Sequence, residues 1–146
     1  MPLKLKSSAN ADIHQTVIYW MELLSAEKYT EAFELTWHDP YYQWTPSLLE
    51  KVINGYGLPD QTLDVIHKVT SPQTAVLDIN NQNIYKDISL FDTPLSRNHG
   101  SPEIEIIGDV FYDLPIDGHW SDLTASFRIL QGADFFGLEL NDIHVL

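Results

Sequence analysis

The last third of the chain constrains the fold most strongly. Residues 103–115, 119–131 and 135–146 are three long runs rich in β-branched and aromatic residues. Asp117–Gly118, between the first two runs, is a dipeptide that two-residue hairpin turns prefer, and Gly132–Asp134 joins the second run to the third. Together the runs predict an antiparallel meander.

Alternation along these runs predicts which side chains face the core. In the third run the apolar parity changes between Leu140 and Ile143, which predicts a β-bulge at Asn141–Asp142. The predicted inward residues of the first two runs are Ile104, Ile106, Val110, Tyr112, Leu114, Leu123, Ala125, Phe127 and Ile129.

The first half of the chain has helical periodicity instead. Apolar residues recur every three or four positions over 13–24 and again over 29–37, with a break at 25–28. Because the residue before a proline disfavours helical geometry, Pro40 should end the second helix by Asp39. The sequence thus predicts two consecutive helices.

A third helix and two strands are predicted in the middle of the chain. Thr45–Pro46 is a good cap and first residue for the helix, which Gly55 should end. The apolar period then becomes two over 63–70, predicting a strand, and a short strand is predicted at 74–79. Residues 80–102 are interpreted as mostly loop, and local structure around residues 84–91 is left open.

The length of the chain, 146 residues, predicts one domain, residues 1–146. Cysteine is absent, which excludes disulfides, thiolate metal sites and cysteine nucleophiles and favours a reducing cytoplasm. No apolar run resembles a signal peptide, and the most apolar segment, 17–24, is too short to cross a bilayer. We therefore expect a soluble cytoplasmic protein without a targeting segment.

Charge excludes further classes of function. Eight Lys and Arg residues against 21 Asp and Glu residues give a net charge of −13. Clustered cations that would neutralise phosphates are lacking, so neither nucleic acid nor an anionic membrane surface is an expected partner. A basic protein partner remains an alternative through electrostatic steering, beside the simpler interpretation that acidity maintains solubility.

Two passages resemble a known superfamily. WMELLSAEKYTEAF, residues 20–33, looks like the first helix, break and second helix of the nuclear transport factor 2-like superfamily (the cystatin-like α+β cone). HWSDLTASFRILQGADFFGLELNDIHVL, residues 119–146, looks like its closing strands, and is similar to small bacterial domains of unknown function. The resemblance implies three N-terminal helices packed on a curved antiparallel sheet around a cone-shaped cavity.

The resemblance implies less about activity. That superfamily contains dehydratases, isomerases, polyketide cyclases, transport factors and many proteins without known activity, so its fold does not specify a reaction. Its members often dimerise through the outer face of the sheet. No catalytic set of the superfamily matches this sequence residue by residue, and we assign no catalytic residue from it.

The aromatic stretch FELTWHDPYYQWTP, residues 33–46, is a candidate pocket wall. Large amphipathic rings suit a ligand site, but the same rings can plug one end of the core, and both interpretations stay open. His38 and Asp39 are adjacent and diverge, so Asp39 is expected to form an Asx turn instead. The candidate ligand-binding residues are Trp20, Trp37, Tyr41, Trp44, Tyr56, His67 and Tyr112.

His67 is the best candidate for acid–base chemistry. It has the parity of the inward apolar residues of its predicted strand, and imidazole exchanges protons near neutral pH. Tyr112 has inward parity on another strand, so a His67–Tyr112 pair is a candidate reactive site. The alternative is a core histidine that makes one hydrogen bond.

The outward residues of the meander suggest a dimer interface. An exposed apolar sheet face would be unusual for a monomer, and Arg128 would pair with an acidic neighbour there. The alternative is a mixed surface that residues 80–102 partly cover. The candidate interface residues are Ile107, Phe111, Trp120, Arg128 and Leu130.

Metal and cofactor motifs are not found in the sequence. The six histidines lack ligand spacing, and no phosphate-binding loop or GxSxG motif is present. The leading hypothesis is a homodimeric, non-catalytic binding module for a small apolar or aromatic ligand. The alternatives are a small lyase or isomerase with His67 as base, and an acidic protein that neutralises a basic partner.

Overall fold

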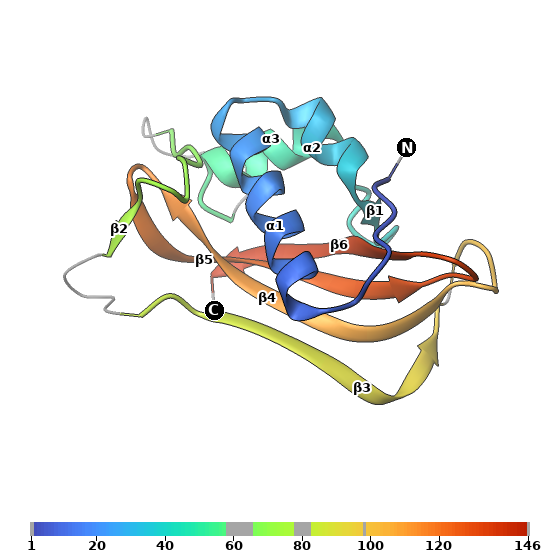
Figure 1. Ribbon diagram of the computed structural model, residues 1–146. Coiled ribbons are helices and arrows are strands. Elements are labelled where there is room, and N and C mark those ends of the chain that lie inside the picture. Colours follow the sequence, from blue (N-terminus) through green and yellow to red (C-terminus); the bar gives the residue numbers. More distant parts are fainter. Residues whose placement is uncertain (1, 58–65, 78–82, 98, 146) are drawn as a thin grey trace.

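Three helices cover one face of a curved sheet (Figure 1). The computed structural model describes residues 2–57, 66–77, 83–97 and 99–145. Within these ranges the helices are α1 (Asn10–Ser25), α2 (Tyr29–Leu35) and α3 (Pro46–Asn54). The predicted α+β class is confirmed. None of these helices has the length and hydropathy that crossing a bilayer requires.

The sheet contains six strands in the described ranges, in the order β1-β6-β5-β4-β3, with β2 beside β5. The predicted meander is confirmed as three antiparallel strands. Asp117 and Gly118 have φ angles of 52° and 88°, the left-handed geometry that the two-residue hairpin requires. The strands are β1 (Trp37–His38), β2 (Val76–Leu77), β3 (Lys86–Ser96), β4 (Glu105–Ile116), β5 (His119–Gln131) and β6 (Phe136–Val145).

The core lies between the helices and the concave side of the sheet. Phe127 of β5 meets Trp20 of α1 edge to face, with ring centroids 5.0 Å apart. The predicted inward residues of β5 all belong to this core and are almost fully buried. The helix-facing side of the sheet is therefore the side that carries Phe127.

The predicted bulge in β6 is confirmed. Ser126 pairs with Asp142 while the next residue of β5, Phe127, pairs with Leu140, so Asn141 is the extra residue. The bulge lets Leu140 and Ile143 both reach the core, where each is about 2% exposed or less.

The predicted start of α3 is also confirmed. The side-chain oxygen of Thr45 accepts a hydrogen bond of 3.0 Å from the backbone N–H of Leu48, and Pro46 occupies the first helical position. Gly55 follows the last helical residue. Local capping chemistry thus sets where this helix begins, and its buried Leu49, Val52 and Ile53 hold it against the core.

The second helix ends before Asp39, as predicted, but it is shorter than the predicted apolar stripe over 29–37. Helix α2 ends at Leu35, and Thr36 is extended, with φ −119° and ψ 159°. Trp37 and His38 then pair in parallel with Glu139 and Leu140 of β6. Pairing with a strand about a hundred residues later in the chain overrides the helical periodicity.

The interpretation of residues 80–102 as mostly loop is wrong. Residues 86–96 form β3, a strand at the end of the sheet. Most of its side chains are exposed on both faces, so its sequence lacks the alternation that identifies a half-buried strand. The contacts that define it come from β4.

The strand predicted at 63–70 is not found in its described part. Residues 66–70 make only an isolated bridge, between Val69 and Ile116, and residues 63–65 lie outside the described residues. The short strand predicted at 74–79 is confirmed for Val76–Leu77, and residues 78–79 lie outside the described residues.

Candidate functional site

An open groove lies between the first turns of α1 and strands β3 and β4, and we call it the α1–β4 groove. Its volume is about 620 Å³. Helix α1 contributes one wall, and β3 and β4 contribute the other. The lining residues are Asn10, Ala11, His14, Gln15, Lys86, Asp87, Ile88 and Tyr112.

A hydrogen bond between α1 and β4 forms the polar centre of this groove. The Tyr112 hydroxyl lies 3.0 Å from Nδ1 of His14, and the Tyr112 side chain is 2% exposed. Burial raises the pKa of the Tyr112 phenol. The tautomer of His14 decides whether that phenol donates to Nδ1 or accepts from it.

The β3 wall adds charge and an apolar contact. Lys86 and Asp87 are exposed, and Ile88 is half-buried. Asp87 already accepts a hydrogen bond of 2.9 Å from the Ser89 hydroxyl. The Lys86 ammonium, the His14 ring and the Ile88 side chain therefore offer a cation, a second polar group and one apolar surface to a ligand.

A second, smaller groove of about 440 Å³ lies beside the β4–β5 hairpin, and we call it the hairpin groove. Nδ1 of His67 lies 2.8 Å from a carboxylate oxygen of Asp117. The other oxygen of Asp117 accepts from the Lys68 backbone N–H at 3.1 Å. The lining residues are Tyr56, His67, Leu77, Ile116, Asp117, His119, Trp120 and Ser121.

The proposed His67–Tyr112 pair is not formed. His67 pairs with Asp117 in the hairpin groove, whereas Tyr112 bonds His14 in the α1–β4 groove. Asp117 lies in the hairpin turn, and its backbone N–H donates to the Lys68 carbonyl at 3.0 Å. The same contacts that orient His67 therefore also anchor residues 67–68 to the hairpin.

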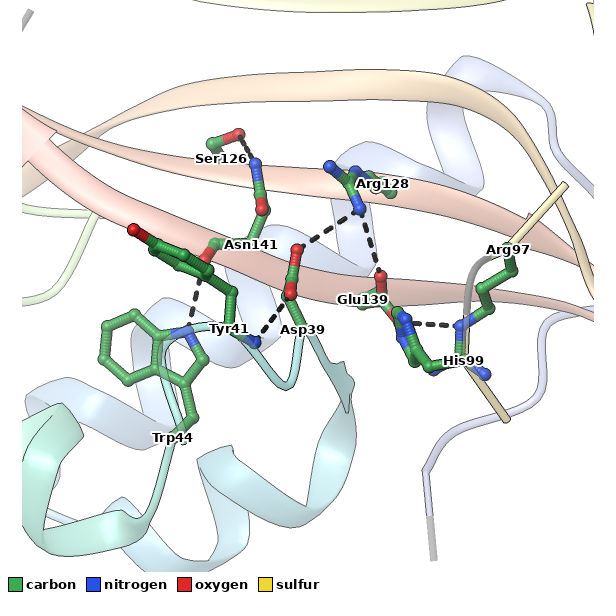
Figure 2. Close-up of polar contacts among 9 residues, drawn as sticks. All are labelled: Asp39, Tyr41, Trp44, Arg97, His99, Ser126, Arg128, Glu139 and Asn141. Carbon is green, nitrogen blue, oxygen red and sulfur yellow. Dashed lines mark hydrogen bonds and ion pairs between the residues drawn. The ribbon is translucent and has the colours of Figure 1, made fainter. Parts of the chain in front are cut away.

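A group of charged side chains lies on the sheet face that points away from the helices (Figure 2). We call it the Glu139 cluster; it comprises Asp39, Arg97, His99, Arg128 and Glu139. Glu139 is fully buried. One of its carboxylate oxygens accepts from Arg97 Nε at 2.8 Å and lies 2.9 Å from His99 Nε2. The buried carboxylate is thus paired with one segment, residues 97–99, that lies far from Glu139 in the sequence.

Arg128 links this cluster to the loop after β1. Its guanidinium donates to Asp39 at 3.2 Å and lies 3.8 Å from the second oxygen of Glu139. Asp39 also accepts a hydrogen bond of 2.9 Å from the Tyr41 backbone N–H, so the predicted Asx turn is confirmed (Figure 2). The acidic neighbours expected for Arg128 thus lie in its own chain.

The tryptophans of the candidate ligand site pack against protein. Trp20 is 1% exposed, and Trp44 is 7% exposed with its ring N–H donating to the Asn141 carbonyl at 3.2 Å. The Trp37 ring stacks on Phe135, with centroids 5.4 Å apart. Tyr41 points to solvent, at 81% exposure. The seven residues do not meet in one cavity: Tyr112 lines the α1–β4 groove, and Tyr56 and His67 line the hairpin groove.

The expectation of an exposed apolar sheet face is wrong. The β4–β5 register shifts near Ile107 and again between Asp113 and Pro115, and these bulges turn Ile107 and Trp120 into the core. Leu130 is fully buried as well. Phe111 is half-buried and stacks on Tyr85 at 6.3 Å, leaving Arg128 among polar neighbours.

The residues that sequence reasoning missed carry weak signals. His14 and Lys86 lie in polar surroundings that nothing in the sequence distinguishes. Glu139 alternates with the inward Leu138 and Leu140, so the sequence predicts an outward, solvated carboxylate. Its burial depends on contacts with residues distant in sequence, such as Arg97. Among the described residues, no three His, Cys, Asp or Glu side chains are grouped closely enough to hold a metal ion.

Comparisons with known proteins add no identification. No family model, curated protein or solved structure matches the chain. The superfamily resemblance therefore stays an expectation from the sequence, and any function has to be argued from the geometry of the site.

Proposed function

We propose that the chain is a non-catalytic binding module for a small ligand, which binds in the α1–β4 groove. The observation that carries the proposal is the buried Tyr112–His14 hydrogen bond inside an open groove. Ligand sites combine concave surface with a few fixed polar groups, and this groove has both. The burial of Trp44 and the stacking of Trp37 on Phe135 favour this groove over the aromatic stretch 33–46.

The groups in the groove favour a small organic acid with an apolar body. The Lys86 ammonium is a cationic donor, which suits a carboxylate, the His14 ring is a polar neighbour, and Ile88 offers apolar contact. The carboxylate of Asp87 opposes an anion, but its hydrogen bond to Ser89 occupies one oxygen. The sequence suggested a small apolar or aromatic ligand, and this assignment adds that the ligand carries a carboxylate.

The fold supports the proposal through the superfamily resemblance. We propose membership of the nuclear transport factor 2-like superfamily because three helices precede a curved sheet, with a groove between the first helix and that sheet. In that superfamily ligands bind inside the cone. The element order supports this assignment. In this proposal the α1–β4 groove corresponds to the open cone in which members of the superfamily bind ligands.

The test is ligand-observed NMR with benzoate, phenylacetate, hexanoate and their neutral amides. Ala11 is exposed and lines the groove, so Ala11→Trp fills the site without entering the core. Ala26→Trp is the matched control, because Ala26 is exposed just after the other end of the same helix. At least one acid should bind wild type and Ala26→Trp and lose binding in Ala11→Trp. Equal binding to all three proteins, or no binder, would contradict the proposal.

A second candidate function is acid–base catalysis by His67. The specific observation is its 2.8 Å contact with Asp117, because a carboxylate on Nδ1 orients an imidazole so that Nε2 can act as a base. We would measure exchange of α-protons of small ketones and thioesters into D₂O. Exchange that His67→Ala abolishes and His14→Ala retains would support a lyase or isomerase. Exchange unaffected by His67→Ala would remove His67 from that role.

A further inference from the structure

Strand β3 is the end strand of the sheet and has a free side. It pairs with β4, and no other described strand pairs with it. Nine of its eleven residues are exposed, with Leu90 54% exposed. An edge strand offers unpaired backbone donors and acceptors to a partner strand. The inference concerns what pairs with this edge, and it is independent of the proposed ligand.

The two halves of β3 differ in how well they suit pairing. Lys86 to Leu90 follow a regular register with Tyr112 to Gly108. The register then shifts before Leu95, and Pro94 lies in this irregular part. Bulges and prolines protect edges from pairing, so the end of β3 around Pro94 is protected and the N-terminal half is open.

The backbone direction of the open half follows from Gly108. A Cβ atom on Gly108 would lie 2.3 Å from the Ser89 carbonyl oxygen, so that oxygen points toward β4. Backbone groups of successive strand residues point to opposite sides. Ile88 and Leu90 therefore direct their N–H and C=O groups to the free side of the sheet.

We propose that β3 pairs antiparallel with β3 of a second copy of this chain, with the twofold axis at Ser89. This register places Ile88 opposite Leu90 of the second copy, so the outward backbone groups of both strands meet. It also places Lys86 opposite Asp92 of the second copy, and twofold symmetry makes this ion pair twice. Charge complementarity selects this register, since an axis at Leu90 would place Lys86 opposite Pro94.

The proposed edge dimer replaces the interface that the sequence suggested. The outer sheet face provides little exposed apolar area, whereas the edge provides Leu90 beside Ile88. Ile88 also lines the α1–β4 groove, so Leu90 of the second copy would extend that groove's apolar wall. Each copy carries a net charge of −13, so mutual repulsion weakens the dimer at low salt.

The experiment is sedimentation velocity of four proteins over a wide concentration range in moderate salt. Asp92→Lys places lysines opposite each other and should raise the dimer dissociation constant roughly tenfold, since each exposed pair contributes up to about 1 kcal/mol. Lys86→Asp/Asp92→Lys reverses both charges and should restore the wild-type constant. Asp134→Lys is the control, because it changes net charge equally at an exposed turn.

Hydrogen exchange gives the second readout. The amides of Ile88 and Leu90 should become protected as wild-type concentration rises. A wild-type protein that stays monomeric overturns the proposal. A dimer that Asp92→Lys weakens no more than Asp134→Lys does also overturns it, as does a charge reversal that fails to restore the wild-type dissociation constant. A dimer whose Ile88 and Leu90 amides stay unprotected overturns it as well.

Discussion

Glu139 shows how a single buried residue organises distant segments. Both arginines of the chain, Arg97 and Arg128, lie against its carboxylate. Arg97 follows β3, Arg128 belongs to β5, and Asp39 in the same network follows β1. The Glu139 cluster thus connects strands from both edges of the sheet on the face that the helices leave uncovered.

Removing Glu139 should therefore be costly. Glu139→Ala leaves the Arg97 side chain, which is 6% exposed, without its nearest carboxylate. Breaking a buried ion pair by removing one partner costs about 3–5 kcal/mol. Urea denaturation should show such a loss in the free energy of unfolding, and Arg97→Met/Glu139→Leu should lose less. Glu105→Ala is the exposed control, and a loss for Glu139→Ala below about 1 kcal/mol would contradict a buried charge pair.

His38 makes stability depend on pH. Burial lowers the pKa of the His38 imidazole, although its contact with the Phe33 carbonyl and the nearby Glu139 oppose this effect. Between the lowered folded value and the unfolded value of about 6.5, the unfolded chain binds more protons. The His38 contribution to stability is therefore complete above that range and is lost as pH falls through it.

His38→Phe isolates this contribution. The new ring can keep the stack on Phe33, where the centroids are now 3.9 Å apart, but it cannot be protonated. Denaturation at several pH values should show the stability difference between wild type and variant shrinking below about pH 6.5. A difference that is constant or grows toward low pH would contradict the lowered pKa.

At the scale of elements, local signals were sufficient where the cause was local. The Asp117–Gly118 turn, the Thr45 cap and the parity change at Asn141 each follow from neighbouring residues, and each is confirmed. Strands β1 and β3 were missed because pairing with β6 and β4 creates them. In the candidate site Tyr112 was predicted but its partner His14 was missed for the same reason, since the two residues are 98 positions apart.

Gly137 tests the pairing of β1 with β6. A Cβ atom on Gly137 would lie 2.2 Å from the Trp37 ring. Gly137→Ala should push Trp37 and β1 away, at about 1–3 kcal/mol, which is typical of overpacking. Thermal unfolding would measure the loss. Gly118→Ala is a control, because a methyl group there meets no neighbouring atom and so reports backbone strain without overpacking. A Gly137→Ala protein as stable as wild type would contradict the close packing of Trp37 on β6.

At the scale of the whole molecule, the main electrostatic property is the large net negative charge. The net charge of −13 repels itself within the folded chain, and the same field would steer a basic protein partner. Electrostatic repulsion between exposed charges weakens within about 10 Å at 0.1 M salt. Local pairs such as Lys68–Glu27 bring opposite charges together but leave the net charge unchanged.

Salt should therefore stabilise the fold. The midpoint of thermal unfolding should rise as sodium chloride is increased from low to physiological ionic strength. Differential scanning fluorimetry at constant pH checks this, with the concentration held fixed because association also shifts the midpoint. A midpoint that falls with salt would mean that attractive pairs outweigh the net repulsion.

The proposed ligand site is tested most directly by mapping amide shifts in a ¹H–¹⁵N titration with the acid that binds best. Binding in the α1–β4 groove predicts saturable shifts at His14, Lys86 and Tyr112, with the Ala11→Trp protein unchanged. Shifts centred on Tyr56, His67 and Trp120 would place the site in the hairpin groove and contradict the account. Scattered, unsaturable shifts would show that neither groove is a ligand site.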